Sequence, residues 1–286
     1  MKMGDERFPP MKKNLRYRLI TSFLFIPALI VISHKGSIHY LLLIEAGIGI
    51  GVYEFFKILE SKGIRPYKTL GITSALLLGW SAYSQNYLST FLILTALLFL
   101  LSVAEFPRKD PSVAILHIST TFYGILYVGW LFSHLILLRE LPHALEKPYE
   151  EGGSYTLLPF VIAWSYDSVA FFIGTRFGKF KLLPRISPGK SWEGSIAGLF
   201  ASLLGIFLFK KIDASYLSTL DCILLGTVGS FLAQTGDLVE SLIKRDANVK
   251  DTSLIIPGHG GFLDRFDSIL FVAPVVYYYL RFIKAN

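Results

Sequence analysis

The chain has 286 residues, of which 52% are apolar and only 17% are charged, whereas about a quarter of the residues in a soluble domain are charged. This composition excludes a disordered chain and a chain that coats nucleic acid. The formal net charge of +7 then indicates basic loops beside anionic lipid headgroups. The single cysteine, Cys222, excludes an intramolecular disulfide and a multi-cysteine metal site, and the absence of an HExxH motif disfavours a zinc hydrolase.

Nine apolar runs predict membrane-spanning helices, for which about 20 residues are needed. They cover 19–33, 38–56, 70–83, 87–105, 112–138, 157–175, 194–209, 217–236 and 266–283. The first follows a basic tail, 1–18, and is expected to be a retained anchor because no signal-peptidase site follows it. The fifth is long enough to tilt or to break at Gly124 or Gly129. We therefore expect an all-α, polytopic membrane protein with one membrane domain, 19–286.

The distribution of basic residues predicts the orientation, because lysine and arginine accumulate on the cytoplasmic side of a membrane. With nine spans and a cytoplasmic N-terminus, 21 of the 28 lysines and arginines lie inside. The same arrangement puts the two loops richest in polar motifs, 176–193 and 237–267, on the cytoplasmic face. We expect a multi-pass protein of the cytoplasmic (inner) membrane, with its active site on the cytoplasmic side.

Three carboxylic acids lie inside the predicted spans. Asp167 lies in the polar stretch Trp164-Ser165-Tyr166-Asp167-Ser168 of the sixth span. An ionised aspartate at that depth costs about 2.5–3.5 kcal/mol on insertion scales, so it should face a cavity or a partner. Glu45 and Glu54 of the second span have no polar neighbours, and we assign them to packing between helices or to a headgroup contact.

The loop before the seventh span contains Ser187-Pro188-Gly189-Lys190-Ser191-Trp192-Glu193-Gly194. Its Gly-Lys-Ser resembles the end of a nucleotide-binding P-loop, but Pro184 stands where that motif needs its first glycine, and no β-strand is expected before it. A P-loop is therefore excluded. Ser191 is expected to cap the seventh helix, and Lys190 and Arg176 are candidate phosphate-binding cations.

The stretch from Gly236 to Arg245 continues the eighth span with polar residues. On a helix, positions three and four apart share a face, so Asp237, Ser241, Lys244 and Arg245 form one polar stripe. The alternative is a helix end whose charges are only solvated.

A glycine-rich loop follows, Pro257-Gly258-His259-Gly260-Gly261-Phe262-Leu263-Asp264-Arg265-Phe266-Asp267. Three glycines around His259 allow the backbone N–H groups to approach an anion such as phosphate. Asp264 and Asp267 are three apart and project from one face at the start of the ninth helix. Mg²⁺ binds through one or two carboxylates plus substrate phosphates, so these acids and Asp237 are candidate ligands.

The residues from Ser241 to Asp267 resemble the C-terminal signature of the phosphatidate cytidylyltransferases, also called CDP-diacylglycerol synthases. The stretches 164–168 and 187–194 are similar to two further parts of that family, while the first five spans resemble it only as apolar helices. Gly189 departs from the pattern, because many members have a basic residue there.

The resemblance implies an integral membrane enzyme of phospholipid biosynthesis that condenses CTP with phosphatidate, requires Mg²⁺, has its catalytic part in 157–286, and forms a homodimer. It implies metal ligands at Asp237, Asp264 and Asp267. It implies a catalytic pocket and phosphate site formed by Asp167, Lys190, Ser191, Ser241, Lys244, Arg245, Lys250, His259 and Arg265, with Gly258, Gly260 and Gly261 in the binding loop. His259 is expected to donate a hydrogen bond to a phosphate rather than to move a proton.

Two alternatives remain. A CTP-dependent lipid kinase would use the same membrane setting, metal and loop, and would differ in which phosphorus atom is attacked. A transporter would explain Glu45, Glu54 and Asp167 as an intramembrane relay. It would leave the glycine-rich loop and its two aspartates unexplained.

Overall fold

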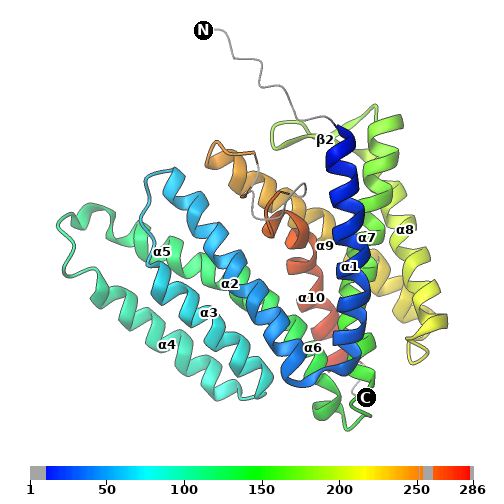
Figure 1. The fold of residues 1–286 in the computed structure, drawn as a ribbon, viewed down its shortest axis with the longest axis horizontal. Coiled ribbons are helices and arrows are strands. Elements are labelled where there is room, and N and C mark those ends of the chain that lie inside the picture. The colour runs from blue at the N-terminus through cyan, green and yellow to red at the C-terminus, as the bar shows by residue number, and fades with distance from the viewer. Residues whose placement is uncertain (1–10, 251, 254–259, 284–286) are drawn as a thin grey trace.

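The computed structural model describes residues 11–250, 252–253 and 260–283, with side chains from Phe23 onward, and it is almost entirely helical (Figure 1). The predicted all-α class is confirmed. The helices are α1 (Met11–Lys35), α2 (Ser37–Ser61), α3 (Lys68–Tyr83), α4 (Tyr87–Ala104), η1 (Pro111–Val113), α5 (Ala114–Gly124), η2 (Ile125–Trp130), α6 (Leu131–Leu145), α7 (Glu151–Phe177), α8 (Trp192–Ile212), α9 (Thr219–Asp246) and α10 (Leu263–Ile283).

Each of the nine predicted runs falls on helical structure, but nine membrane crossings are not confirmed. Within the described ranges, six helical segments are long and apolar enough to cross a membrane: α4, Pro111–Leu145, α7, α8, α9 and α10. Of the others, α3 has only 16 residues, and α2 carries Glu45 and Glu54 among its apolar residues. The chain is therefore a multi-pass membrane protein.

Large apolar side chains face outward on the surfaces of α4 and α8. Phe91 is 67% exposed and Phe200 is 65% exposed. Contiguous apolar surface of this kind is rare on soluble monomers, so it fits contact with lipid chains.

One helix boundary and one irregular segment follow from local sequence. A π-helical segment, η2, lies between α5 and α6 directly after Gly124, one of the two glycines where the sequence allows the span to break. The helix changes its hydrogen-bond pattern there but continues without a break from Pro111 to Leu145. Helix α9 begins with a capping box in which the Ser218 side chain accepts the Asp221 N–H and the Asp221 side chain accepts the Ser218 N–H. It then continues ten residues beyond the predicted span, which places Asp237 to Arg245 on the helix, as expected.

A short antiparallel hairpin between α7 and α8 was not expected from the sequence. Its strands are β1 (Lys181–Leu183) and β2 (Ser187–Ser191), and Lys181 pairs with Ser191. The prediction that no strand precedes this motif is wrong, because Pro184, Pro188 and Gly189 conceal the alternating pattern. Strand β2 itself runs through Gly189-Lys190-Ser191, so this segment is extended. The predicted cap is confirmed, since the Ser191 Oγ accepts the Gly194 N–H at 3.2 Å.

Helix α10 lies in the middle of the bundle. It contacts α9, α7, α6 and α2, and Figure 1 shows α2, α3 and α4 on one side of it and α7 and α8 on the other. Its residues Ile269, Leu270 and Val272 are buried. The start of α10 consequently meets residues from both halves of the chain. Helix α1 begins at Met11, inside the predicted basic tail, 1–18.

Candidate active site

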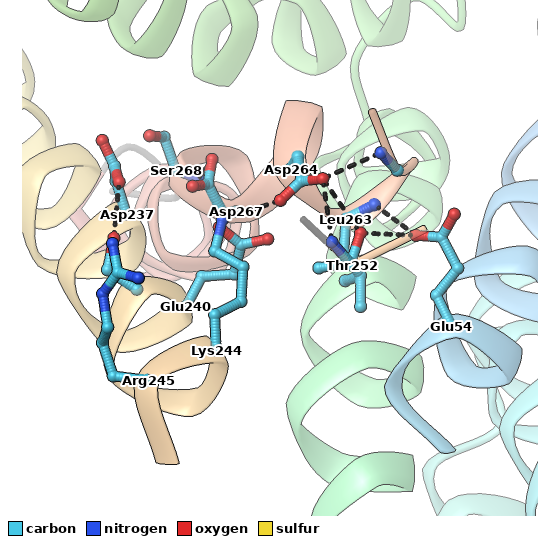
Figure 2. Close-up of polar contacts among 12 residues, drawn as sticks. Glu54, Asp237, Glu240, Lys244, Arg245, Thr252, Leu263, Asp264, Asp267 and Ser268 are labelled. Atoms are coloured by element: carbon cyan, nitrogen blue, oxygen red, sulfur yellow. Dashed lines mark hydrogen bonds and ion pairs between the residues drawn. The ribbon is translucent and has the colours of Figure 1, made fainter. Parts of the chain in front are cut away.

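A lysine connects the end of α9 with the start of α10. The Lys244 Nζ donates to Glu240 Oε2 at 2.6 Å and to Asp264 Oδ1 at 2.7 Å, as Figure 2 shows for the pair with Asp264. The side chains of Glu240 and Asp264 are only 3% and 10% exposed. Buried carboxylates require a partner of opposite charge, and Glu240 and Asp264 share this one ammonium group, which balances only one of their two negative charges.

A second lysine connects the hairpin with α9. The Lys190 Nζ in β2 lies 2.6 Å from Asp237 Oδ2, and the Ser241 Oγ donates to Asp237 Oδ1 at 3.4 Å. One turn further on, Arg245 Nε donates to the Ile186 carbonyl at 3.4 Å. The predicted stripe on α9 is thus real, and it faces the hairpin and α10 rather than being only solvated.

Two more aspartates come together behind this stripe. The Ser268 Oγ of α10 donates to Asp167 Oδ1 of α7 at 3.3 Å, which confirms that Asp167 faces a polar partner. The Asp267 carboxylate is buried and accepts the Ser268 N–H at 2.7 Å. The negative charges of Asp167, Asp237 and Glu240 all act on Asp267, so carboxylates from α7, α9 and α10 lie close together here.

The carboxylate of Asp264 is already fully engaged. Besides Lys244, it accepts at Oδ2 the Gly261 N–H at 2.8 Å and the Thr252 N–H at 3.1 Å. A Cβ at Gly261 would overlap the Thr252 hydroxyl, and Gly260 has a φ of 81°, which only glycine adopts readily. The close contact at Gly261 and the positive φ of Gly260 therefore explain why glycine occupies these two positions. Gly258 and His259 lie outside the described residues.

Glu54 of α2 is a site residue that the sequence reasoning missed. It is completely buried and accepts the backbone N–H groups of Phe262 and Leu263, both at 2.9 Å; Figure 2 shows the bond from Leu263. The predicted contact between helices is therefore confirmed, and the structure adds that it is made with the start of α10, directly before Asp264. A signal was available, since the first N–H groups of any helix need an acceptor, and the residues just before α10 offer no local cap.

The remaining predicted residues lie at the edge of the cluster. Arg265, in the first turn of α10, is exposed, and its charge acts on Asp167. Lys250 follows the end of α9 and is exposed. Arg176 lies in the last turn of α7 with its guanidinium 5.7 Å from the ring centre of Phe177, and within the described part of the chain it forms no ion pair with the aspartates.

The donor set has the chemistry that Mg²⁺ prefers. Glu240 Oε1 is buried with no hydrogen-bond partner among the residues that the structure describes, and three aspartates face the same region. In that same part of the chain, no group of three or more His, Cys, Asp or Glu side chains is close enough together to hold a metal ion. These residues do not form a complete protein cage, and an ion held here would need further ligands, such as the phosphates of a substrate.

Known proteins match the chain over nearly its whole length. A model of the cytidylyltransferase family matches residues 16–283. The chain is 31% identical to the phosphatidate cytidylyltransferase of Bacillus subtilis, over 93% of this chain and 98% of that one. It is 33% identical to the phosphatidate cytidylyltransferase of Synechocystis, over 92% and 95%, and 31% identical to phosphatidate cytidylyltransferase 4, chloroplastic, of Arabidopsis thaliana, over 83% and 66%.

These features define a multi-pass membrane protein with a charged site where several helix ends meet. The chain belongs to the cytidylyltransferase family. The resemblance predicted from the sequence is confirmed, and it extends to the first half of the chain as well.

Proposed function

We propose that the protein transfers the cytidylyl group of CTP to phosphatidate, giving CDP-diacylglycerol and diphosphate, at the cluster between α9, α10 and β2. The observation that carries the proposal is the pairing of Lys190 with Asp237 and of Lys244 with Glu240 and Asp264. When a substrate phosphate arrives, each ammonium group can release its carboxylate partner and pair with the phosphate, which carries more negative charge and more acceptor oxygens. The relatives named phosphatidate cytidylyltransferase support this choice of substrates.

The reaction brings two anions together. A phosphate oxygen of the lipid attacks the α-phosphorus of CTP, and the bond from that phosphorus to the oxygen bridging it to the β-phosphorus breaks, so that diphosphate leaves. The attacking oxygen is ionised at neutral pH, and no general base is required. Lys190, Lys244 and the basic residues at the edge of the cluster, Arg245, Lys250 and Arg265, reduce the repulsion and stabilise the charge that develops on the departing diphosphate.

We further propose Mg²⁺ as the cofactor, held by Asp237 and Asp267 together with substrate phosphates. When bound, it would supply Lewis-acid polarisation of phosphoryl oxygens. Asp264 could join these ligands only by releasing Lys244, because its oxygens already accept four donors. Asp167 and Ser268 then form the wall behind the metal, and Ser191 contributes by fixing the start of α8 beside Lys190. We keep the homodimer as a proposal.

The direct test is an assay with purified protein. In detergent with phosphatidate, CTP and Mg²⁺, we expect one diphosphate released for each CDP-diacylglycerol formed, with the lipid product identified by mass spectrometry. Omitting phosphatidate is the control and should give no diphosphate. Diphosphate release that does not depend on phosphatidate would contradict the proposed acceptor.

We propose that the site opens to the cytoplasm. The loops 176–193 and 237–267, which carry the site, are rich in lysine and arginine, and such loops accumulate on the cytoplasmic side of a membrane. In a Cys222→Ser background, Lys181→Cys in β1 should react with an impermeant thiol reagent only after the membrane is opened. Lys147→Cys, between α6 and α7, should react from outside. Both positions are exposed, so access depends on the membrane side alone. The reverse labelling pattern would invert the orientation and remove the site from cytosolic CTP.

A further inference from the structure

Glu54 holds the first turn of α10 from a distant part of the chain. Its carboxylate accepts the Phe262 and Leu263 N–H groups at 2.9 Å each, about 200 positions along the sequence. These are N–H groups that a helix cannot satisfy internally. A negative charge is favoured at this end of a helix dipole, and here α2 provides it in place of a local cap.

The same carboxylate also fixes the chain that leaves α9. It accepts the Thr252 hydroxyl, at 3.1 Å from Oε2, and the Ser253 hydroxyl. The Thr252 hydroxyl lies equally 3.1 Å from Asp264 Oδ2, so its one hydrogen is shared between Glu54 and Asp264. Because a buried carboxylate is costly unless it is hydrogen-bonded, these donors are what makes the charge of Glu54 tolerable inside the bundle.

The face of α2 around Glu54 is shaped for close contact with α10. Gly47, Gly51 and Glu54 fall on one side of the helix by their spacing. A Cβ at Gly47 would lie 2.8 Å from the Phe262 ring, and one at Gly51 would lie 3.6 Å from the same ring and 3.7 Å from the Leu263 side chain. Phe262 in turn stacks on Phe266 of α10, with ring centres 4.3 Å apart. The packing of glycines and aromatic rings therefore shows close contact between α2 and the start of α10, independently of the hydrogen bonds of Glu54.

We propose that Glu54 is a positioning residue of the active site. Glu54 binds Thr252 and Ser253 on the side of α9 and Phe262 and Leu263 on the side of α10. It thereby sets the position and rotation of the first turn of α10. This placement brings Asp264 and Asp267 into the cluster and keeps Asp264 in reach of Lys244. The inference rests on the proposed function, in which these aspartates serve the reaction. It extends the functional part of the chain beyond 157–286, because the N-terminal half then supplies more than membrane anchoring.

The test compares two glutamates of the same helix. Glu54→Gln keeps the size of the side chain but loses the charge and turns an amide N–H₂ toward donors. A misplacement of about 1 Å can cost about 100-fold in rate, so we expect kcat per folded molecule to fall about 100-fold, with a smaller change in KM for CTP. Glu54→Asp keeps the charge and should recover part of kcat. Glu45→Gln, the matched control in the groove beside Thr73 and Trp80, should behave like the unmodified protein.

Folding is monitored by size-exclusion chromatography and thermal unfolding in detergent. A purely structural role would lower the yield of folded protein and leave kcat per folded molecule unchanged, and that result overturns the inference. If Glu54→Gln does not fold, Thr252→Val replaces it, because it removes only the shared hydroxyl. We then expect about a tenfold lower kcat, and an unchanged kcat is again contradictory. Asp264→Asn is assayed in parallel. Normal turnover in Asp264→Asn would contradict the proposed site itself. Normal turnover in Glu54→Gln together with loss of turnover in Asp264→Asn would contradict only the positioning role of Glu54.

Discussion

Asp237→Asn is expected to lower turnover about 1000-fold while the protein still inserts, purifies and unfolds at nearly the same temperature. The substitution keeps the shape of the side chain but removes the charge that pairs with Lys190 at 2.6 Å. Electrostatic groups that act on a developing charge contribute about 100- to 1000-fold, and the lost carboxylate is also a proposed Mg²⁺ ligand. Turnover is measured as CDP-diacylglycerol formed per folded molecule.

The matched control is Asp246→Asn, nine positions further along α9. The Asp246 side chain is 63% exposed and pairs with Lys62 away from the cluster, and exposed pairs contribute about 0–1 kcal/mol to stability. We expect normal turnover from it. Normal turnover in Asp237→Asn as well would remove that residue from the site.

Lys244→Met is expected to abolish activity and to destabilise the protein. The methionine preserves the apolar stem, but the carboxylates of Glu240 and Asp264 lose their shared cation. Leaving a buried charge unpaired costs about 3–5 kcal/mol, so the unfolding temperature in detergent should fall clearly. Lys57→Met, which removes a 49% exposed lysine paired with Glu60, is the control and should change neither property.

A double variant separates stability from catalysis at this position. Adding Glu240→Gln to Lys244→Met removes one of the two stranded charges and should restore part of the unfolding temperature. Activity should stay absent, because the phosphate-binding ammonium group is still missing. Recovery of turnover in the double variant would contradict the role given to Lys244.

Local sequence patterns were enough to predict the positions of the helices and the polar face of α9. The apolar runs located the helices, and the three- and four-residue spacing placed Asp237, Ser241 and Lys244 on one face of α9. The glycines at 260 and 261 marked a segment of close backbone contact and positive φ, while their predicted role in phosphate binding stays a prediction. Each of these features depends on residues near one another in the chain, so that periodicity and turn chemistry are enough to reveal them.

The contacts between distant segments were not predictable in the same way. The bonds from Glu54 to the start of α10 depend on how the N-terminal helices pack against the C-terminal ones. Likewise, the Lys190–Asp237 pair forms because the β1–β2 hairpin places Lys190 beside α9. The prolines at 184 and 188 disrupt the alternating pattern that would have predicted this hairpin. Hydropathy alone also does not fix the number of membrane crossings, because the apolar helix α3 has only 16 residues and α2 carries Glu45 and Glu54 among its apolar residues.

The most direct test of the central claim follows one phosphorus atom. Purified protein is incubated with phosphatidate, Mg²⁺ and CTP that is labelled in the α- or the γ-phosphate. Attack on the α-phosphorus predicts α-label in the lipid and γ-label in diphosphate. Lipid that carries the γ-label, with CDP as the other product, would instead show a kinase and contradict the account.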